Sequence, residues 1–197
     1  MDSILKLEKS VSENTWFVSD THFHHYKLCK SCEDKLEHCR KYTTVEEMDS
    51  DIIKQWNEQI KPDDIVIFGG DFMLDVKPDD FADEFHRIRN QLNGDIYFIK
   101  GNHDDILKKK IFDTTVYNYA VITFGGKIYF VQHKDFSENC SFINKEIEQG
   151  LDLNNTALIH GHTHSNIEYS SNNFLHKKMH NICWDVKYRP IKITEIM

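Results

Sequence analysis

The sequence predicts an α/β fold in which short buried strands alternate with helices. Apolar, β-prone runs occur at residues 15–19, 65–68 and 96–99, and stretches with helical spacing of apolar residues separate them. Strands joined in this way are typical of crossover units on a largely parallel sheet. The carboxyl ends of such strands meet at one edge of the sheet, where open α/β folds bind ligands. We therefore expect functional side chains just after each strand.

The helix after the first strand is predicted from its cap and its period. Thr43 and Thr44 each precede a glutamate by three residues, which is the spacing of a capping box. The apolar residues that follow recur at helical spacing: Val45, Met48, Ile52, Ile53, Trp56 and Ile60. This pattern predicts an amphipathic helix with its apolar face in the core. A second helix is expected after Pro78, with Asn93-Gly94 as its stop.

The second half of the chain predicts a hairpin and further strands. Gly125-Gly126 separates β-prone runs at 119–124 and 127–133, a strong hairpin signal. A short helix is expected near 142–150, a strand at 157–160, and closing strands near 182 and 191–193. Residues 1–13 could form a short strand or an unstructured lead. No repeat or linker divides the 197 residues, so a single domain over 1–197 is expected.

Composition limits the classes of protein that fit the chain. A net charge of −8 opposes non-specific binding to nucleic acid or to anionic membranes. No apolar run approaches the ~20 residues that span a bilayer. The five cysteines are odd in number and follow no signal-peptide pattern, which favours a reduced, cytoplasmic protein. The 12 histidines beside many aspartates point to bound divalent cations as a local source of positive charge.

Residues 26–42 are expected to form a polar insertion, because they show no clean period. The segment contains Cys29, Cys32, His38 and Cys39. A zinc knuckle is conceivable, but structural zinc sites usually separate their ligand pairs by more than the six residues between Cys32 and Cys39. We therefore favour a solvent-facing insertion with incidental thiols.

Side chains that can bind metal follow each predicted strand. They are two carboxylates, one amide and four imidazoles: Asp20, His22, Asp71, Asn102, His133, His162 and His164. Each short motif alone is also an ordinary turn sequence. Together, oxygen and nitrogen donors without thiolates suit two divalent ions such as Mn²⁺, Fe²⁺ or Zn²⁺. One carboxylate would have to bridge, and Asp71 is expected to do so because it follows the middle strand of three.

Five segments occur in a fixed order: Asp20-Thr21-His22, Gly70-Asp71, Gly101-Asn102-His103-Asp104, His133 and Gly161-His162-Thr163-His164. In this order they closely resemble the calcineurin-like metallophosphoesterase family, and their span covers most of the chain. The surroundings of Glu46 and Trp56 look like a small, single-domain bacterial and phage branch of predicted phosphoesterases. The resemblance implies a metallophosphoesterase-like sandwich of two mainly mixed β-sheets flanked by helices, with the site at the carboxyl ends of strands.

The resemblance also implies roles for these residues in a dinuclear phosphoesterase acting on phosphate mono- or diesters. One ion would be held by Asp20, His22, Asp71 and His164, and the other by Asp71, Asn102, His133 and His162. Mn²⁺ is the expected metal, with Fe, Zn or Ni as alternatives. Two such ions can activate a bridging hydroxide for in-line attack on phosphorus. His103 would assist the leaving group, with Asp104 fixing its tautomer or orientation.

Two positions depart from the family pattern. His24 stands where the branch typically has Gly, and Lys134 follows His133 where Gly or Tyr-Pro is commoner. Metal binding should survive both changes, whereas the rim of the pocket is expected to differ. His25 and Arg40 are candidates for substrate contact, together with His24 and Lys134.

Two other functions compete with the enzyme. One is an inactive scaffold that keeps the fold for protein binding, and retention of every ligand type disfavours it. The other is a DNA nuclease of the same family, which the net charge of −8 disfavours. The expected partner is therefore a small phosphorylated substrate, with no membrane and no nucleic acid. The oligomeric state and the choice between monoester and diester stay open at this point.

Overall fold

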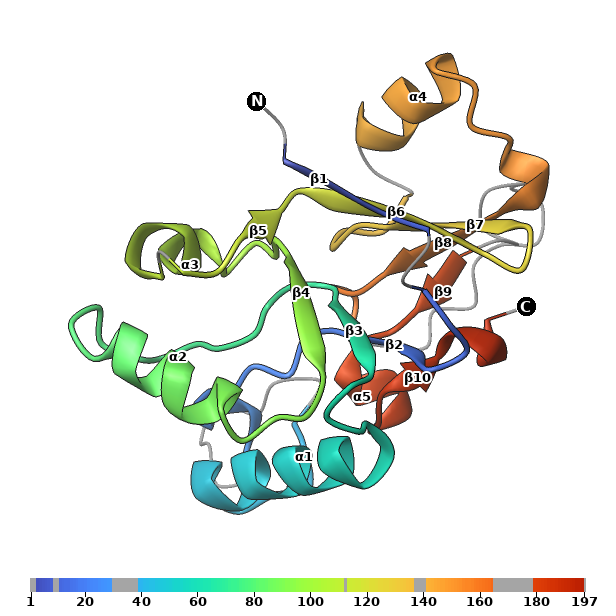
Figure 1. Cartoon of the computed structure of the whole chain (residues 1–197). Helices are drawn as coiled ribbons and strands as arrows, with labels where there is room; N and C mark the ends of the chain where they lie inside the picture. Colours follow the sequence, from blue (N-terminus) through green and yellow to red (C-terminus); the bar gives the residue numbers. More distant parts are fainter. Residues whose placement is uncertain are drawn as a thin grey trace.

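Two β-sheets pack against each other at the centre of the protein, with helices on their outer faces (Figure 1). The structure is a computed structural model that describes residues 3–8, 11–29, 39–111, 113–136, 141–164 and 179–196. The first sheet has the order β1 (Ile4–Leu7), β6 (Tyr119–Phe124), β7 (Lys127–Val131), β8 (Thr156–His160) and β9 (Met179–Asn181). The second has the order β10 (Ile191–Lys192), β2 (Thr15–Val18), β3 (Ile65–Phe68), β4 (Asp95–Ile99) and β5 (Val116–Tyr117).

The second sheet has the predicted crossover connections. Strands β2, β3, β4 and β5 are parallel, and only β10 is antiparallel to its neighbour. The connecting helices are α1 (Val45–Gln59), α2 (Phe81–Arg89) and α3 (Asp105–Lys110). The order β2-β3-β4 makes β3 the middle strand, so the prediction of an α/β sandwich with mixed sheets is confirmed.

Helix α1 begins where its capping sequence predicts. The hydroxyl of Thr44 accepts from the backbone N–H of Glu47 at 3.2 Å, and the Glu47 carboxylate accepts from the N–H of Thr43 at 2.8 Å. These two bonds satisfy N–H groups that the first turn leaves unpaired. Trp56 is fully buried on the apolar face, and its indole N–H donates to the carbonyl of Asn93 at 2.9 Å. This bond ties the helix to the turn that leads into β4.

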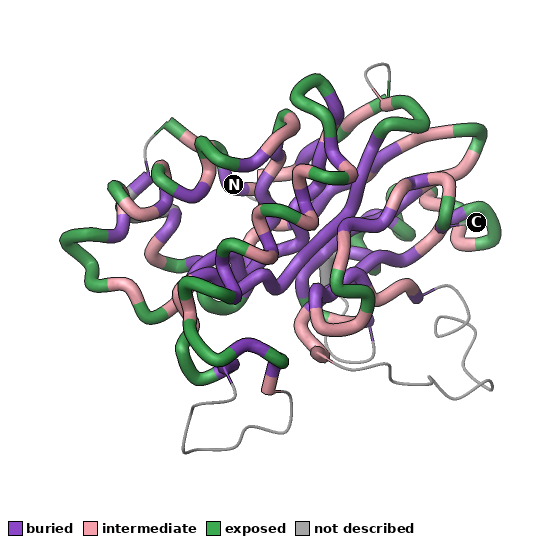
Figure 2. The backbone as a smooth tube through the Cα atoms, turned by 90° about the horizontal axis from the view of Figure 1, so that it is seen from below, coloured by how far each residue is buried: buried purple, intermediate pink, exposed green. Residues whose placement is uncertain are grey.

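Alternate residues of β3 face different layers. Val66 and Phe68 belong to the core under α1 and α2, whereas Ile67 belongs to the core between the two sheets. Phe72 packs against Phe68 with ring centroids 5.2 Å apart and against Phe85 with ring centroids 5.3 Å apart. Buried residues therefore run along the strands, and exposed residues gather on the outer helices and loops (Figure 2).

The first sheet contains the predicted hairpin of β6 and β7. Helix α4 (Ser141–Glu148) covers its outer face, where Ile143 packs with Tyr119, Phe130 and Leu158. Residues 4–7 form a strand that pairs in parallel with β6, so the amino-terminal segment is the short strand rather than an unstructured lead.

The prediction of a solvent-facing insertion at 26–42 is wrong at both of its ends. A 3₁₀ turn (Tyr26–Leu28) leads into the core, where Cys29 and Tyr42 are buried. Residues 30–38, including Cys32, lie outside the described residues. Cys29, Cys39 and Cys183 are free thiols, and burial raises the pKa of Cys29.

The carboxyl-terminal segment differs in detail from the closing strands that were predicted. Trp184 is in the core as expected, but it begins a short helix, α5 (Trp184–Lys187). Strand β10 is followed by a 3₁₀ turn (Ile193–Glu195), and another 3₁₀ turn (Leu153–Asn155) precedes β8. No helix in the described ranges combines the length and the apolar character that crossing a bilayer requires.

Candidate metal centre

The predicted ligands follow strands of both sheets and meet at one edge of the sandwich. Asp20, Asp71 and Asn102 come after β2, β3 and β4, whereas His133 and the His162–His164 segment come after β7 and β8. The two groups are joined directly, because the N–H of His162 donates to the Asp20 carboxylate at 3.0 Å. The seven candidates thus come from distant parts of the sequence to a common centre.

Asp20, His22 and His164 form the first group, with ligand atoms within 4.8 Å of one another. The Nε2 atoms of His22 and His164 are 3.2 Å apart, and the His164 Nε2 lies 3.5 Å from Asp20 Oδ1. Asp20 is fully buried, and its Oδ1 has no hydrogen-bond partner among the described residues. A buried carboxylate oxygen in this position is costly unless a cation or a donor satisfies it.

Asp71, His133 and His162 form the second group, also within 4.8 Å. The Nδ1 of His133 donates to the carbonyl of Gly69 at 2.9 Å, so Nε2 is the nitrogen that faces the centre. That Nε2 lies 2.8 Å from Asn102 Oδ1 and 3.3 Å from Asp71 Oδ2. Three atoms with lone pairs converge here, which favours a proton or a metal ion between them.

Asp71 belongs to the second group and also faces the first. Its Oδ2 is 3.7 Å from the His22 Nε2 and 3.3 Å from the His133 Nε2, and its Oδ1 accepts the backbone N–H of His103 at 2.9 Å. This position agrees with the bridging role expected for the acid on the middle strand.

The charges at the centre favour bound cations. Burial opposes a charge on His133, yet Asp20 and Asp71 raise the pKa of its imidazole to about 9. Burial also opposes ionisation of Asp71, but its hydrogen bond with His133 holds the pKa of the Asp71 carboxyl well below its usual range. Burial lowers the pKa of His22 well below its usual value, which keeps a neutral imidazole available for metal.

The backbone at the centre is strained. Asp20, His22, Asp71, His162 and His164 have positive φ angles of 56°, 47°, 59°, 70° and 48°. Residues other than glycine rarely adopt this left-handed conformation, which costs on the order of 1–3 kcal/mol each and clusters at functional sites. Five of the seven candidate ligands carry this cost, a concentration that points to function.

Two glycines let the ligand loops approach one another. A Cβ atom at Gly101 would overlap Asp71, and a Cβ atom at Gly161 would overlap Asp20 and Ser19. The Ser19 hydroxyl donates to Asp20 Oδ2 at 2.5 Å. This bond orients the carboxylate so that its other oxygen, Oδ1, faces His164. The glycines of the two motifs therefore make room for the carboxylates.

His103 lies beside the centre and outside both groups. Its side chain is 44% exposed, and its Nε2 is 4.0 Å from Asp71 Oδ2. The expected role of Asp104 in fixing this imidazole is wrong. Asp104 is buried and accepts from the backbone N–H groups of Gly101 at 2.7 Å, Asp71 at 2.8 Å and Phe72 at 3.2 Å. Burial and the charge of Asp71 raise the pKa of the Asp104 carboxyl to about 6.

Arg40 is not placed to contact substrate, which corrects the expectation from the sequence. Its side chain is fully buried, and its guanidinium donates to Asp185 and to the carbonyls of Asp20 and Thr21. Asp185 also accepts from the Nδ1 of His164 at 2.6 Å, a contact that sequence reasoning missed. The only signal for it was another aspartate just after an apolar run.

His164, Cys183 and Asp185 form a third group of ligand type within 4.8 Å. We do not regard it as a third metal site, because the Arg40 guanidinium already occupies both oxygens of Asp185. Two opposite charges in contact leave little reason for a further cation.

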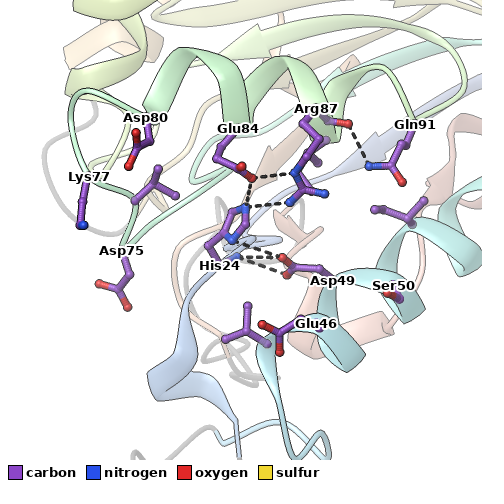
Figure 3. A pocket seen from close by; sticks show the side chains of 14 residues that line it. His24, Glu46, Asp49, Ser50, Asp75, Lys77, Asp80, Glu84, Arg87 and Gln91 are labelled. Atoms are coloured by element: carbon purple, nitrogen blue, oxygen red, sulfur yellow. Dashed lines mark hydrogen bonds and ion pairs between the residues drawn. The ribbon is translucent and has the colours of Figure 1, made fainter.

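A pocket of about 650 Å³ lies between α1 and α2, close to the ligand loops (Figure 3). Its centre is His24, whose Nε2 is 3.0 Å from Glu84 and 3.2 Å from Arg87, and whose backbone N–H donates to Asp49. His25 lies between pocket and centre: its Nε2 is 3.8 Å from Asp75 on the pocket wall, and its ring centroid is 5.5 Å from that of His22.

The chain is similar to known proteins over most of its length. The model of the calcineurin-like phosphoesterase superfamily domain matches residues 14–177. An uncharacterized protein of Methanocaldococcus jannaschii is 32% identical over 185 residues, which cover 92% of this chain and 88% of that protein. The crystal structure of a protein of unknown function from Aquifex aeolicus shares the fold, with a TM-score of 0.60, 23% identity, and coverage of 92% of this chain and 96% of that one.

The match of the phosphoesterase family model over residues 14–177 indicates a hydrolase that acts on phosphate esters. The chain belongs to the calcineurin-like phosphoesterase superfamily. The family implies divalent metal ions, and the donors present here fit them, because two sets of oxygen and nitrogen lone pairs face one another around Asp71.

Proposed function

We propose that the protein is a dinuclear metal-dependent phosphoesterase that hydrolyses mono- or diesters of small phosphorylated molecules in the cytoplasm. The observation that carries this proposal is the position of Asp71, whose Oδ2 is 3.3 Å from His133 of its own group of three potential ligands and 3.7 Å from His22 of the other group. Asp20, His22, Asp71 and His164 would hold one ion, and Asp71, Asn102, His133 and His162 the other. Mn²⁺ is the metal we expect.

The residues around the centre have separable tasks in this reaction. When bound, two divalent ions would lower the pKa of water and offset the charge of the phosphate. His103, at the exposed rim, would donate a proton or a hydrogen bond to the leaving oxygen. Asp71 accepts the backbone N–H of His103 and thereby holds this residue beside the centre. Asp104 fixes the turns that carry both residues by accepting three backbone N–H groups.

The direct test is hydrolysis of an aryl phosphomonoester and an aryl phosphodiester by the purified protein. We expect turnover with Mn²⁺, none after metal removal, and recovery when Mn²⁺ is added back. A screen of nucleotides, cyclic nucleotides, sugar phosphates and phosphodiesters would then identify the natural class of ester. If metal-replete protein is inert on the whole panel, the hypothesis of an enzyme is wrong and that of a protein-binding scaffold is favoured.

We also propose that the organic part of the ester extends from the centre past His25 into the pocket between α1 and α2. The wall of this pocket carries more acidic than basic side chains: Glu46, Asp49, Asp75, Asp80 and Glu84 against Lys77 and Arg87. An acidic wall repels a phosphate group, so the phosphate is better placed at the metal centre. The imidazole of His24 lies between Glu84 and Arg87 of α2 and Asp49 of α1, on the wall that the organic group would contact (Figure 3).

His24→Gly is expected to raise KM for esters with a large polar organic group, because the imidazole between Glu84 and Asp49 is removed. Stability should change by less than about 1 kcal/mol, since glycine adopts positive φ without strain. Steady-state kinetics and urea unfolding measure the two effects. Tyr188→Gly is a matched control, because Tyr188 has a φ of 53° and is exposed directly after α5. Unchanged KM for all esters would show that the pocket is not used.

A further inference from the structure

Arg40 joins three segments that are distant in the sequence. Its guanidinium donates from Nε to Asp185 Oδ1 at 2.7 Å and from Nη2 to Asp185 Oδ2 at 3.0 Å. The same group donates to the carbonyl of Asp20 at 2.7 Å and to the carbonyl of Thr21 at 2.6 Å. The planar guanidinium suits such a set of fixed acceptors, which a lysine could not serve together. Arg40 therefore fixes the backbone of the Asp20–His22 loop relative to Asp185.

Asp185 in turn orients His164. Because a carboxylate can only accept, the 2.6 Å contact means that the Nδ1–H of His164 donates to it. The other nitrogen, Nε2, then turns its lone pair toward Asp20 Oδ1 at 3.5 Å and His22 Nε2 at 3.2 Å. The segment that carries Asp185 is itself attached to the end of β2, since the N–H of Trp184 donates to the carbonyl of Ser19 at 2.9 Å.

The two ligand groups are oriented in different ways. In the second group, His133 donates its Nδ1–H to the backbone carbonyl of Gly69. In the first group, His22 Nδ1 has no hydrogen-bond partner among the described residues. The orientation of the first group therefore depends on His164 and on the loop that Arg40 holds.

We propose that the Arg40–Asp185 pair is a positioning element for one metal site only, the one formed by Asp20, His22 and His164. The inference rests on the proposed function in taking these three residues as metal ligands. The two sites are expected to respond differently: loss of the pair weakens metal binding at the first site and leaves metal binding by Asp71, His133 and His162 intact. Partners that orient a ligating imidazole typically contribute 10- to 100-fold to metal affinity, so we expect a loss of about that size.

The test is Mn²⁺ binding to the full chain by titration calorimetry, with metal content after gel filtration and EPR as further readouts. In Asp185→Asn, the first site should bind Mn²⁺ about 10- to 100-fold more weakly while the second keeps its affinity. EPR of this variant should show the hyperfine pattern of an isolated Mn²⁺ in place of a spin-coupled pair. Arg40→Lys keeps the charge but loses the planar group that donates to several acceptors at once. It should therefore show the same loss of Mn²⁺ affinity at the first site only.

A double-mutant cycle separates positioning through His164 from a merely structural role. In the background of His164→Ala, Asp185→Asn should cause a clearly smaller loss of affinity at the first site than in the wild type, because only the loop held by Arg40 can still be affected. A role independent of His164 would add its full effect. Glu195→Gln is the matched control, because it breaks a bidentate pair with Arg189 at the surface, with contacts of 2.9 and 2.6 Å. Both sites should remain unchanged in this control.

The outcomes distinguish this inference from the proposed function. Asp185→Asn protein that binds two ions like the wild type, or that stays folded and loses both equally, would overturn the positioning role. Wild-type protein that binds no Mn²⁺ would overturn the metalloenzyme itself, and the positioning role with it.

Discussion

Asp71→Asn is expected to reduce kcat/KM by ~10³-fold or more, because metal ions contribute several kcal/mol and each ~1.4 kcal/mol is tenfold in rate. Asp71 Oδ2 is the oxygen that faces His22 and His133 together. An amide keeps the shape and can still accept the N–H of His103, but it removes the charge that both ions would share. Titration with Mn²⁺ should therefore show weaker binding at both sites. Asn102→Ala, which alters a residue that contacts His133 and is expected to bind only the second ion, provides the single-site reference.

Asp64→Asn is the control for this experiment. Asp64 is also buried, but it precedes β3 whereas Asp71 follows it, and it accepts from the indole of Trp16 at 2.9 Å. We expect normal Mn²⁺ affinity and normal turnover in Asp64→Asn. If Asp71→Asn weakens one site and spares the other, the bridging role is refuted, even if activity is lost.

His103→Ala is expected to lower kcat by ~10²–10⁴-fold while Mn²⁺ content and stability remain normal. The reason is that His103 belongs to neither ligand group, is 44% exposed and lies beside Asp71. The loss should be smaller for an aryl ester than for an alkyl ester, because a good leaving group needs less help from an acid. Kinetics on a matched pair of esters, with metal analysis of each sample, measure this.

His86→Ala is the corresponding control, because the His86 side chain is 41% exposed and is paired with Asp113 at 3.8 Å on the outer helix α2. Its activity should equal that of the wild type. Loss of Mn²⁺ from His103→Ala would instead indicate that His103 is a metal ligand. An equal fall in kcat with both esters would refute its role as an acid.

The sequence was sufficient to predict where the strands end and which residues follow them. Apolar runs at 15–19, 65–68 and 96–99 are local signals, and β2, β3 and β4 lie on them. The order of these strands makes Asp71 central, and the structure has that order. The convergence of the seven candidates is therefore readable from short segments, because each segment carries its own strand and its own ligand.

The roles of Asp104, Arg40 and Asp185 could not be read in this way. Each depends on which backbone groups from remote segments lie within hydrogen-bond distance. Asp104 accepts from the N–H of Phe72, 32 positions away, and Arg40 contacts Asp185, 145 positions away. When only the neighbouring residues in the sequence are known, a charged residue in a polar stretch is expected to face the solvent. The burial of Arg40 follows from carbonyl and carboxylate acceptors that only the fold brings together.

The supply of ligands from both sheets has a thermodynamic consequence. Residues before β5 provide Asp20, Asp71 and Asn102, whereas residues after β6 provide His133 and the His162–His164 segment. A cation bound by ligands from both sets would cross-link the two halves of the chain. Its binding free energy would then add to the free energy of unfolding. Removal of the metal by a chelator would weaken the packing of one sheet on the other before it disturbed either sheet alone.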